Sequence, residues 1–247
     1  MIVFKVEKNQ NNFNIKYRII KSVFVITLLC CNILCFSQGQ VTRHGKGKIS
    51  RTSSPKLTLE QIHEKGINAR TDPEAIKWFT KAAEQGYAPS MERLAFYYDH
   101  GYGVPEDKEK AFFWFYKAAV LGMEWSQFRI ASMYQEGKGV GKNGREALKW
   151  YKIGADRGED RSKIFIAFMY YEGDGITQDF GEAAKYFLSV NDKDSNVDVL
   201  YYLGRMYEYG QGVERNLIEA KKWYNRALSV GPYGYENAID KALERLK

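Results

Sequence analysis

Residues Leu94–Gly122 read LAFYYDHGYGVPEDKEKAFFWFYKAAVLG, and residues Ile130–Gly158 read IASMYQEGKGVGKNGREALKWYKIGADRG. The second stretch begins 36 residues after the first and repeats its glycines, its aliphatic residues and its tryptophan in the same order. A fixed period of this length is the signature of a repeat protein in which each repeat is one supersecondary unit. These two stretches therefore decide the fold.

The same register extends along most of the chain in four separate columns. The first column holds a tryptophan or tyrosine at spacings of 36, 36, 36 and 37 residues, at Trp78, Trp114, Trp150, Tyr186 and Trp223. Three residues before each of these stands an alanine, at Ala75, Ala111, Ala147, Ala183 and Ala220. Glycine pairs form the third column, at Gly101 and Gly103, Gly137 and Gly139, Gly173 and Gly175, and Gly210 and Gly212. The fourth column is aliphatic, at Leu94, Ile130, Ile166 and Leu203. The strict register of tryptophan with alanine predicts that the tryptophans belong to the core.

Each repeat reads as two helices. In the first, Leu94, Ala95 and Tyr98 fall on one helical face. The glycine pair then ends that helix, because glycine adopts the left-handed cap conformation without steric cost. The second helix carries the alanine and tryptophan columns. Since one hairpin cannot bury both of its faces, the repeats must stack, which predicts an all-α fold: a right-handed α-solenoid of stacked antiparallel helix pairs.

The predicted organisation has four parts: a signal peptide over 1–37, a flexible linker over 38–56, the solenoid over 57–234 and a capping helix over 235–247. Four repeats carry the full pattern, and a helix from Leu57 to Asn68 is expected to begin the stack. The fourth repeat departs from the pattern, because it lacks the closing glycine and has one inserted residue between Asn191 and Asn196. We expect a local change of curvature at that joint.

The N-terminal segment has the order of a secretory signal. Basic residues come first, at Lys5, Lys8, Lys16, Arg18 and Lys21, and an uncharged apolar run follows from Val23 to Phe36. This run has 14 residues, short of the roughly 20 that a membrane-spanning helix needs. Cleavage after Ser37 would make the protein exported, either periplasmic or secreted. The alternative is an N-terminal anchor that is retained, because the basic region is long. A lipoprotein signal is disfavoured, because leucine or cysteine precedes each cysteine.

Cleavage would also change the composition. All three cysteines lie in the signal, at Cys30, Cys31 and Cys35, so the mature chain would have neither disulfides nor thiol chemistry. Five of the 37 basic residues and one of the 30 acidic residues would be removed, so that the net charge falls from +7 to +3. The apparent basicity therefore makes no strong case for nucleic-acid binding, which needs a concentrated basic face.

The pattern L(A/G)xxY, GxGV and KAxxWYxKAAxxG resembles the Sel-one-like repeat family, a relative of the tetratricopeptide repeats with a slightly longer unit. The resemblance covers roughly Thr71 to Gly231, and the fourth repeat departs from it most. It implies an adaptor that holds protein partners, and it associates exported bacterial members with envelope regulation, secretion and host contact. Some disulfide-rich members are linked to binding or hydrolysing β-lactams, but the mature chain would lack their cysteines.

The face of each first helix that points away from the repeated residues varies from repeat to repeat. First helices usually line the concave surface of such a solenoid, where aromatic and arginine side chains can anchor a partner. We therefore predict partner contacts at Arg93, Phe96, His100, Arg129, Phe165, Phe168, Tyr202, Arg205 and Tyr209. The competing interpretation of each residue is that it packs against the neighbouring helix.

Other chemistry finds little support in the sequence. The stretch Gly137–Gly144 has the glycines of a phosphate loop, but Glu136 and Asn143 stand where that motif needs a glycine and a serine or threonine. The three histidines, His44, His63 and His100, have no metal-ligand spacing. We expect neither a metal nor another cofactor, and no catalysis.

The function predicted from the sequence is that of an exported scaffold that binds a protein or peptide in its concave groove. Two alternatives from other classes stay open. One is an envelope enzyme or glycan binder that acts on peptidoglycan or a β-lactam. The other is an immunity or inhibitory protein that occludes a single partner.

Overall fold

The computed structural model describes residues 56–247 except 191–192, 194–195 and 232–233. The chain divides into one unit over Met1–Ser54 and a second over Pro55–Lys247, and the second contains the described residues. The predicted signal peptide, its anchor alternative and nearly all of the linker lie outside the described residues, as does most of the insertion near Asn191.

The described part of the chain consists of eleven helices and contains no strand. In chain order they are α2 (Leu59–Ile67), α3 (Asp72–Ala83), α4 (Ala88–His100), α5 (Lys108–Val120), α6 (Glu124–Glu136), α7 (Gly144–Asp156), α8 (Asp160–Glu172), α9 (Phe180–Ser189), α10 (Val197–Tyr209), α11 (Leu217–Val230) and α12 (Glu236–Arg245).

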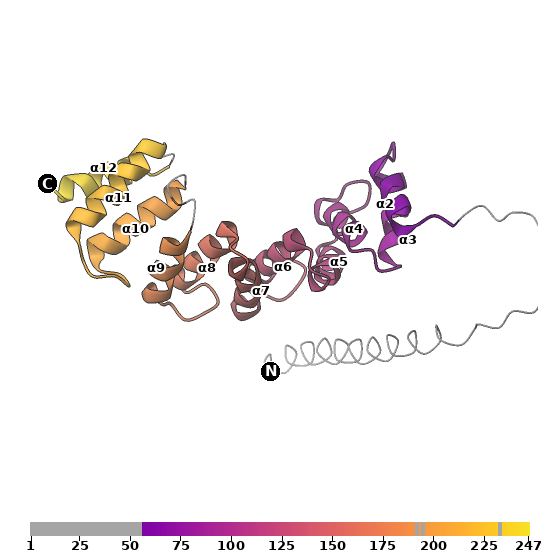
Figure 1. Cartoon of the computed structure of the whole chain (residues 1–247), viewed down its shortest axis with the longest axis horizontal. Coiled ribbons are helices and arrows are strands. Elements are labelled where there is room, and N and C mark those ends of the chain that lie inside the picture. Colours follow the sequence, from indigo (N-terminus) through magenta and orange to yellow (C-terminus); the bar gives the residue numbers. More distant parts are fainter. Residues whose placement is uncertain (1–55, 191–192, 194–195, 232–233) are drawn as a thin grey trace, which may run out of the picture. The chain divides into compact units, whose positions relative to one another are not determined.

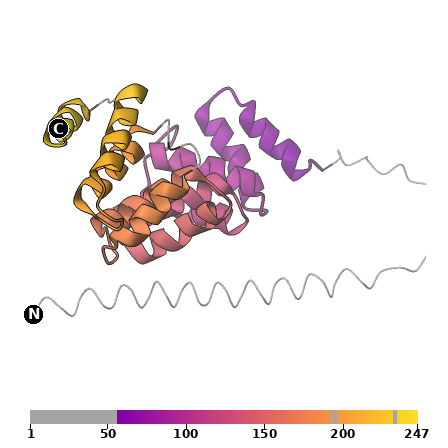
Figure 2. The ribbon, with the colours of Figure 1, turned by 60° about the vertical axis from the view of Figure 1, so that its left-hand side comes forward.

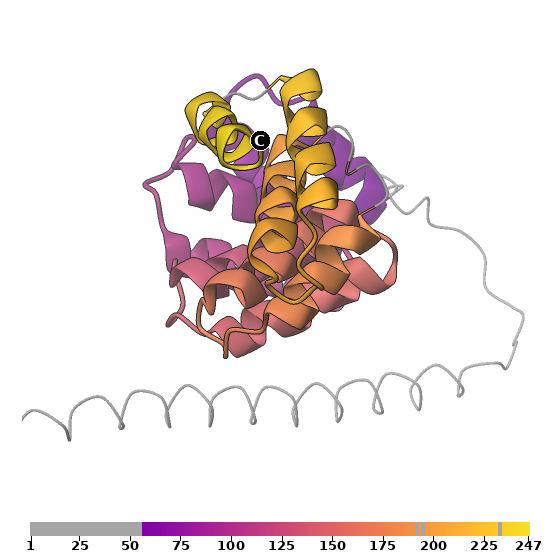
Figure 3. The same cartoon turned by 90° about the vertical axis from the view of Figure 1, so that its left-hand side faces the viewer.

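The helices pair in sequence. The five pairs α2–α3, α4–α5, α6–α7, α8–α9 and α10–α11 each form a hairpin, and α12 packs on α11. Each hairpin also contacts the next, because its second helix packs against the first helix of the following pair. Figure 1 shows this order from α2 to α12, Figure 2 shows the last pair from another side, and Figure 3 looks from the C-terminal end. The predicted all-α solenoid of stacked helix pairs is confirmed. The described residues form five complete pairs, one more than the four repeats in which the sequence shows the full pattern.

The turns are built by repeated glycine and asparagine or aspartate positions. Each first helix from α4 to α10 ends at a glycine in the left-handed conformation, at Gly101, Gly137, Gly173 and Gly210. Each second helix after that turn begins at a side chain that accepts hydrogen bonds from backbone N–H groups of the first turn, at Asp107, Asn143, Asp179 and Asn216. These caps satisfy donors that would otherwise lack a partner at the helix start.

The second glycine of each pair lets one hairpin approach the previous one. A Cβ added at Gly139 would lie 2.0 Å from the carbonyl oxygen of Lys108, at the start of α5. A Cβ at Gly212 would lie 1.9 Å from the carbonyl oxygen of Phe180, at the start of α9. Only hydrogen fits at such distances, so this glycine column joins successive repeats as well as ending a turn.

The centre of the core is the position after the tryptophan column. The residues there are at most 1% exposed, at Phe79, Phe115, Tyr151, Phe187 and Tyr224. Trp114 and Trp150 are half-buried, and each packs against two neighbouring clusters of buried residues. These tryptophans therefore pack at the junctions between repeats, while the aromatic residue that follows each of them is the one buried at the centre of the core.

The C-terminal helix continues the register of a first helix. Ile239 of α12 is fully buried and stands 36 residues after Leu203, and Leu243 keeps the same spacing from Tyr207. Asp240 is the residue of α12 that corresponds to Gly204 of α10, and Gly204 lies against the ring of Tyr224. A charged residue at that position suits a polar outer face, as the predicted capping helix requires.

The joint between α9 and α10 differs from the other joints. α9 ends at Val190, which is buried and extended, without a left-handed glycine. α10 packs more sparsely on α9 than α4 packs on α3, α6 on α5 or α8 on α7. One cluster of buried residues nevertheless continues across the joint, from Ala167 to Ala242. The change of curvature expected there stays a prediction.

Candidate functional site

The candidate binding face consists of three positions on each first helix from α4 to α10: Arg93, Phe96 and His100; Arg129, Ser132 and Glu136; Phe165, Phe168 and Glu172; Tyr202, Arg205 and Tyr209. Five of these residues are exposed: Arg93, His100, Glu136, Glu172 and Tyr209. The others are half-buried, apart from Ser132, which is buried. The exposed members are the ones that a partner could reach without displacing another part of the protein.

Three of the predicted contact residues pack between helices. Phe165 stacks on Tyr151 with the ring centres 5.3 Å apart. Phe168 makes edge contacts with Phe187 at 5.1 Å and with Tyr202 at 5.0 Å. Their packing joins neighbouring repeats, so the competing interpretation of these positions has direct support, and their contact with a partner stays a prediction.

Arg129 ties α6 to α4 through a buried carboxylate. Its Nη2 donates to Oδ2 of Asp99 at 2.6 Å, and the Asp99 side chain is only 4% exposed. The Nζ of Lys108 donates to Oδ1 of the same carboxylate at 3.1 Å. Asp99 therefore has a cation on each oxygen, which compensates the cost of burying its charge. This pairing gives Arg129 a structural role in addition to its predicted contact with a partner.

Four aromatic rings gather at the α4 end of the candidate binding face. We call this cluster the aromatic patch: Phe96, His100, Tyr102 and Trp125. The ring centres of Phe96 and His100 are 4.2 Å apart, and His100 stacks on Tyr102 at 5.4 Å. The Trp125 ring lies 6.1 Å from Phe96 and brings α6 into the patch.

Tyr102 and Trp125 are not among the site residues predicted from the sequence. Tyr102 lies between the two turn glycines, and Trp125 lies in the first turn of α6, so both are outside the face drawn from helical spacing. A signal was nevertheless present, because no other repeat has an aromatic residue at either position. The matching residues are Lys138, Asp174 and Gln211 for Tyr102, and Pro89, Arg161 and Asp198 for Trp125.

The hydrogen bond of His100 fixes its neutral tautomer. Its Nδ1 lies 3.0 Å from the backbone carbonyl oxygen of Phe96. A carbonyl oxygen only accepts, so Nδ1 must carry the proton in that bond, and Nε2 of the neutral ring is then an acceptor. The ring thus combines an apolar face in the patch with a polar edge.

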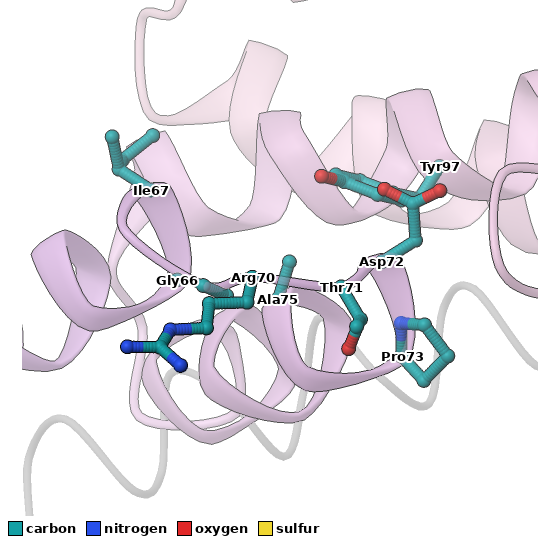
Figure 4. A pocket seen from close by; sticks show the side chains of 9 residues that line it. Gly66, Ile67, Arg70, Thr71, Asp72, Pro73, Ala75 and Tyr97 are labelled. Atoms are coloured by element: carbon teal, nitrogen blue, oxygen red, sulfur yellow. The ribbon is translucent and has the colours of Figure 1, made fainter.

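The concave features elsewhere are shallow. One cleft of about 440 Å³ lies at the turn between α2 and α3, and Figure 4 shows Asp72 beside the ring of Tyr97 while Arg70 points the other way. Burial, followed by the nearby Asp72, raises the pKa of Tyr97. A second cleft of about 590 Å³ follows the turn between α8 and α9. The lining residues include Thr71, Asp72 and Tyr97 in the first cleft and Tyr170, Thr177 and Asp179 in the second.

The glycine-rich stretch 137–144 is the turn between α6 and α7, where Gly137 and Gly139 have positive φ angles of 75° and 70°. These two glycines are thus explained by the backbone conformation of the turn. Within the described ranges, there is no group of three or more histidine, cysteine, aspartate or glutamate side chains placed to hold a metal. Across the same residues, no helix has both the length and the apolar character needed to span a membrane.

Comparison with known proteins agrees with this architecture. The model of the Sel1 repeat matches the chain five times, over residues 61–87, 88–123, 126–159, 162–189 and 197–231. A search of curated proteins gave no match.

Solved structures give the same result. One similar structure is a protective antigen of uropathogenic Escherichia coli strains that displays an SLR fold, with 34% identity and a TM-score of 0.64; the match covers 70% of this chain and 38% of that protein. Another is a Sel1 repeat protein from Oxalobacter formigenes, with 26% identity and a TM-score of 0.62, covering 70% of this chain and 74% of that one. An immunity protein from Pseudomonas aeruginosa is more distant, with 20% identity and a TM-score of 0.37 over 72% of this chain and 68% of that one.

Proposed function

Because the chain belongs to the Sel1 repeat family, we propose that it is a non-enzymatic scaffold that binds a protein or peptide partner along its candidate binding face. Sel1 repeat proteins are typically protein-interaction scaffolds, and their fold is generally non-enzymatic. The partner and the surface that it covers are what we add to that general role.

One observation carries the proposal. The repeated columns account for the core, the turns and the contacts between hairpins, whereas the candidate binding face has a different combination of residues in each repeat. Its exposed members include Arg93 and Tyr209, which are residue types enriched at the centres of protein interfaces. A repeat framework that keeps its core and varies one face is suited to recognising a specific partner.

The test is a pull-down from extracts with two matched triple variants. The first changes Arg93, His100 and Tyr209 to alanine, since all three are exposed and their loss should spare the core. The control changes Val120, Ile153 and Ile218 to alanine, because these apolar residues are 61%, 39% and 72% exposed on second helices. We expect the first variant to lose the specific partner and the control to retain it. Equal recovery by both variants would reject this face as the binding surface.

We propose further that the protein is exported and that residues 1–37 are a cleaved signal. The proposal rests on the order of basic residues and apolar run in the sequence. Mass spectrometry of the protein from its native cells tests it, because cleavage gives a mature chain that begins at Gln38. A retained N-terminus in a membrane fraction would instead support the anchor alternative.

A further inference from the structure

The aromatic patch is exposed to an unusual degree for four rings that are joined through contacts with Phe96. The exposed fraction is 48% for Tyr102 and 37% for Trp125, and the His100 side chain is 39% exposed. Apolar side chains that are exposed singly are ordinary on a protein surface, whereas a contiguous cluster marks a place where another molecule binds. The patch therefore needs an explanation beyond the packing of this chain.

The other repeats show that their fold does not require these rings. Tyr102 is replaced by lysine, aspartate and glutamine in the following repeats, and Trp125 by arginine and aspartate. The same turn closes with the same left-handed glycines in all four cases. Phe96 and Phe168 occupy the same position in their repeats but have different neighbours. The ring of Phe168 packs against Phe187, whereas the ring of Phe96 joins the aromatic patch.

Among the described charged side chains around the patch, the Arg93 guanidinium is the one without an acidic partner. Each bordering carboxylate has a partner: Glu92 accepts from the backbone N–H and the hydroxyl of Ser126, Asp99 pairs with Lys108 and Arg129, Glu106 pairs with Lys108, and Glu136 pairs with Lys138. Arg93 has no ion pair or hydrogen bond to any of the described residues. It is exposed one turn before Phe96, on the side of α4 that also carries His100.

We propose that Arg93 and the aromatic patch together bind an extended peptide that carries a carboxylate about three residues from an apolar side chain. This inference rests on the proposed function and names the chemistry of its partner. The negative charge of the peptide complements Arg93, whose guanidinium can bind a carboxylate with two parallel hydrogen bonds. The apolar side chain lies on the exposed faces of Tyr102 and Trp125.

The spacing of the motif follows from helix geometry. Arg93 and His100 are seven positions apart on α4, which corresponds to roughly 10 Å along the helix axis. An extended peptide in the polyproline II conformation covers that distance in about three residues, at roughly 3.1 Å each, and its period of three residues places side chains i and i+3 on the same side. An acidic residue opposite Arg93 therefore places the side chain three positions away over the patch. The hydroxyl of Tyr102 and Nε2 of His100 can hydrogen-bond the peptide backbone between them.

A displayed library of random dodecapeptides, selected on the full chain, tests this inference and does not require the natural partner to be identified. We expect the selected peptides to be enriched in aspartate or glutamate about three residues from an aromatic, aliphatic or proline residue. Synthetic fluorescent copies of the best peptides then give dissociation constants by anisotropy. Arg93→Ala and Tyr102→Ala should each weaken binding about tenfold or more, whereas the control Ile218→Ala should leave it unchanged.

Two exchanges make the test specific. Replacing the acidic residue of the peptide by its amide should weaken binding to the wild type but have little further effect on Arg93→Ala, because both changes remove one interaction. Arg93→Glu should reject the acidic peptide and recover binding when that residue is lysine. Trp125→Phe keeps a ring against Phe115 and so tests Trp125 in a chain with its packing preserved.

The inference is overturned by any of three results: no peptide is selected, the selected peptides show no acidic enrichment, or they bind Arg93→Ala and Tyr102→Ala as tightly as the wild type. Each result leaves the scaffold proposal to its own pull-down test. If the triple variant of Arg93, His100 and Tyr209 lost a partner that Arg93→Ala and Tyr102→Ala both retained, the scaffold role would stand and this motif would be rejected.

Discussion

The carboxylate of Glu208, in the last turn of α10, is 7% exposed and accepts hydrogen bonds from both Nε and Nη2 of Arg245 in α12, at 3.1 and 2.9 Å. Its other oxygen accepts from the hydroxyl of Tyr224 in α11 at 2.7 Å. One buried acidic side chain thus joins the last hairpin to the capping helix. The burial of Tyr224, followed by its bond to Glu208, raises the pKa of that tyrosine.

Removing the cation should loosen the cap. Arg245→Ala leaves the Glu208 carboxylate buried with one donor, and we expect the free energy of unfolding to fall by about 1 to 2 kcal/mol. The value is below that of a fully buried ion pair, because Arg245 is 52% exposed and water can reach it. Urea unfolding followed by circular dichroism measures the loss. In the Glu208→Gln background the same Arg245→Ala change should cost much less, and an equal cost in both backgrounds would show that the pair is not coupled.

The core offers a comparison between two neighbouring rings. Phe115→Ala should cost about 3 to 5 kcal/mol, because the ring is fully buried in its cluster. Trp114→Ala removes a larger side chain but one that is only half-buried, so we expect a smaller loss. Urea unfolding of both variants orders the two effects, and a larger loss for Trp114→Ala would place the centre of the core at the tryptophan column.

These two rings also show how far sequence could predict the fold. Spacing alone identified the hairpins and the left-handed glycines, because backbone geometry and the need for a shared core fix them at every repeat. The tryptophan column was conspicuous as the rarest repeated residue, yet Phe115 rather than Trp114 occupies the centre. A rare residue such as tryptophan makes the repeat register easy to recognise. Which residue is buried depends instead on which side of the second helix faces both neighbouring helices.

The candidate site was less predictable for a related reason. Helical spacing placed Arg93 and His100 on an exposed face, and both are exposed. It could not show that Phe168 meets Phe187 and Tyr202, since that contact depends on how three helices approach one another. Trp125 lies on the next hairpin, so its contact with Phe96 follows only from the stacking of repeats, whereas Tyr102 reaches Phe96 from the turn after α4.

Two glycines of the same turn should respond differently to alanine. Gly139 has a φ of +70°, and a Cβ there would lie 2.0 Å from the Lys108 carbonyl oxygen, so Gly139→Ala should destabilise the protein by at least about 2 kcal/mol. Gly141 has open space around its Cα, so Gly141→Ala should change the stability by less than about 0.5 kcal/mol. Thermal melts of the two variants are a matched comparison, and similar melting temperatures would contradict the close approach of the hairpins.

His63 of α2 should make the first hairpin sensitive to acid. Its Nδ1 lies 2.8 Å from the hydroxyl of the buried Ser90 in α4, and its ring lies between Phe79 and Tyr87, 5.3 Å from each. Burial, followed by the positive charge of Arg93, lowers the pKa of His63 below 6.5, while Glu64 opposes the shift.

The direction of the pH effect follows from that shift. Below pH 6.5 the unfolded chain binds a proton that the folded imidazole still resists, so stability falls as the pH drops from 6.5 to the folded pKa. His63→Gln keeps a group able to hydrogen-bond Ser90 but cannot titrate, and it should flatten the pH dependence of the unfolding free energy in that window. The titration of the His63 ring by nuclear magnetic resonance gives the folded pKa directly. A midpoint at or above 6.5 would contradict the neutral, half-buried imidazole, because protonation would then cost the folded state nothing.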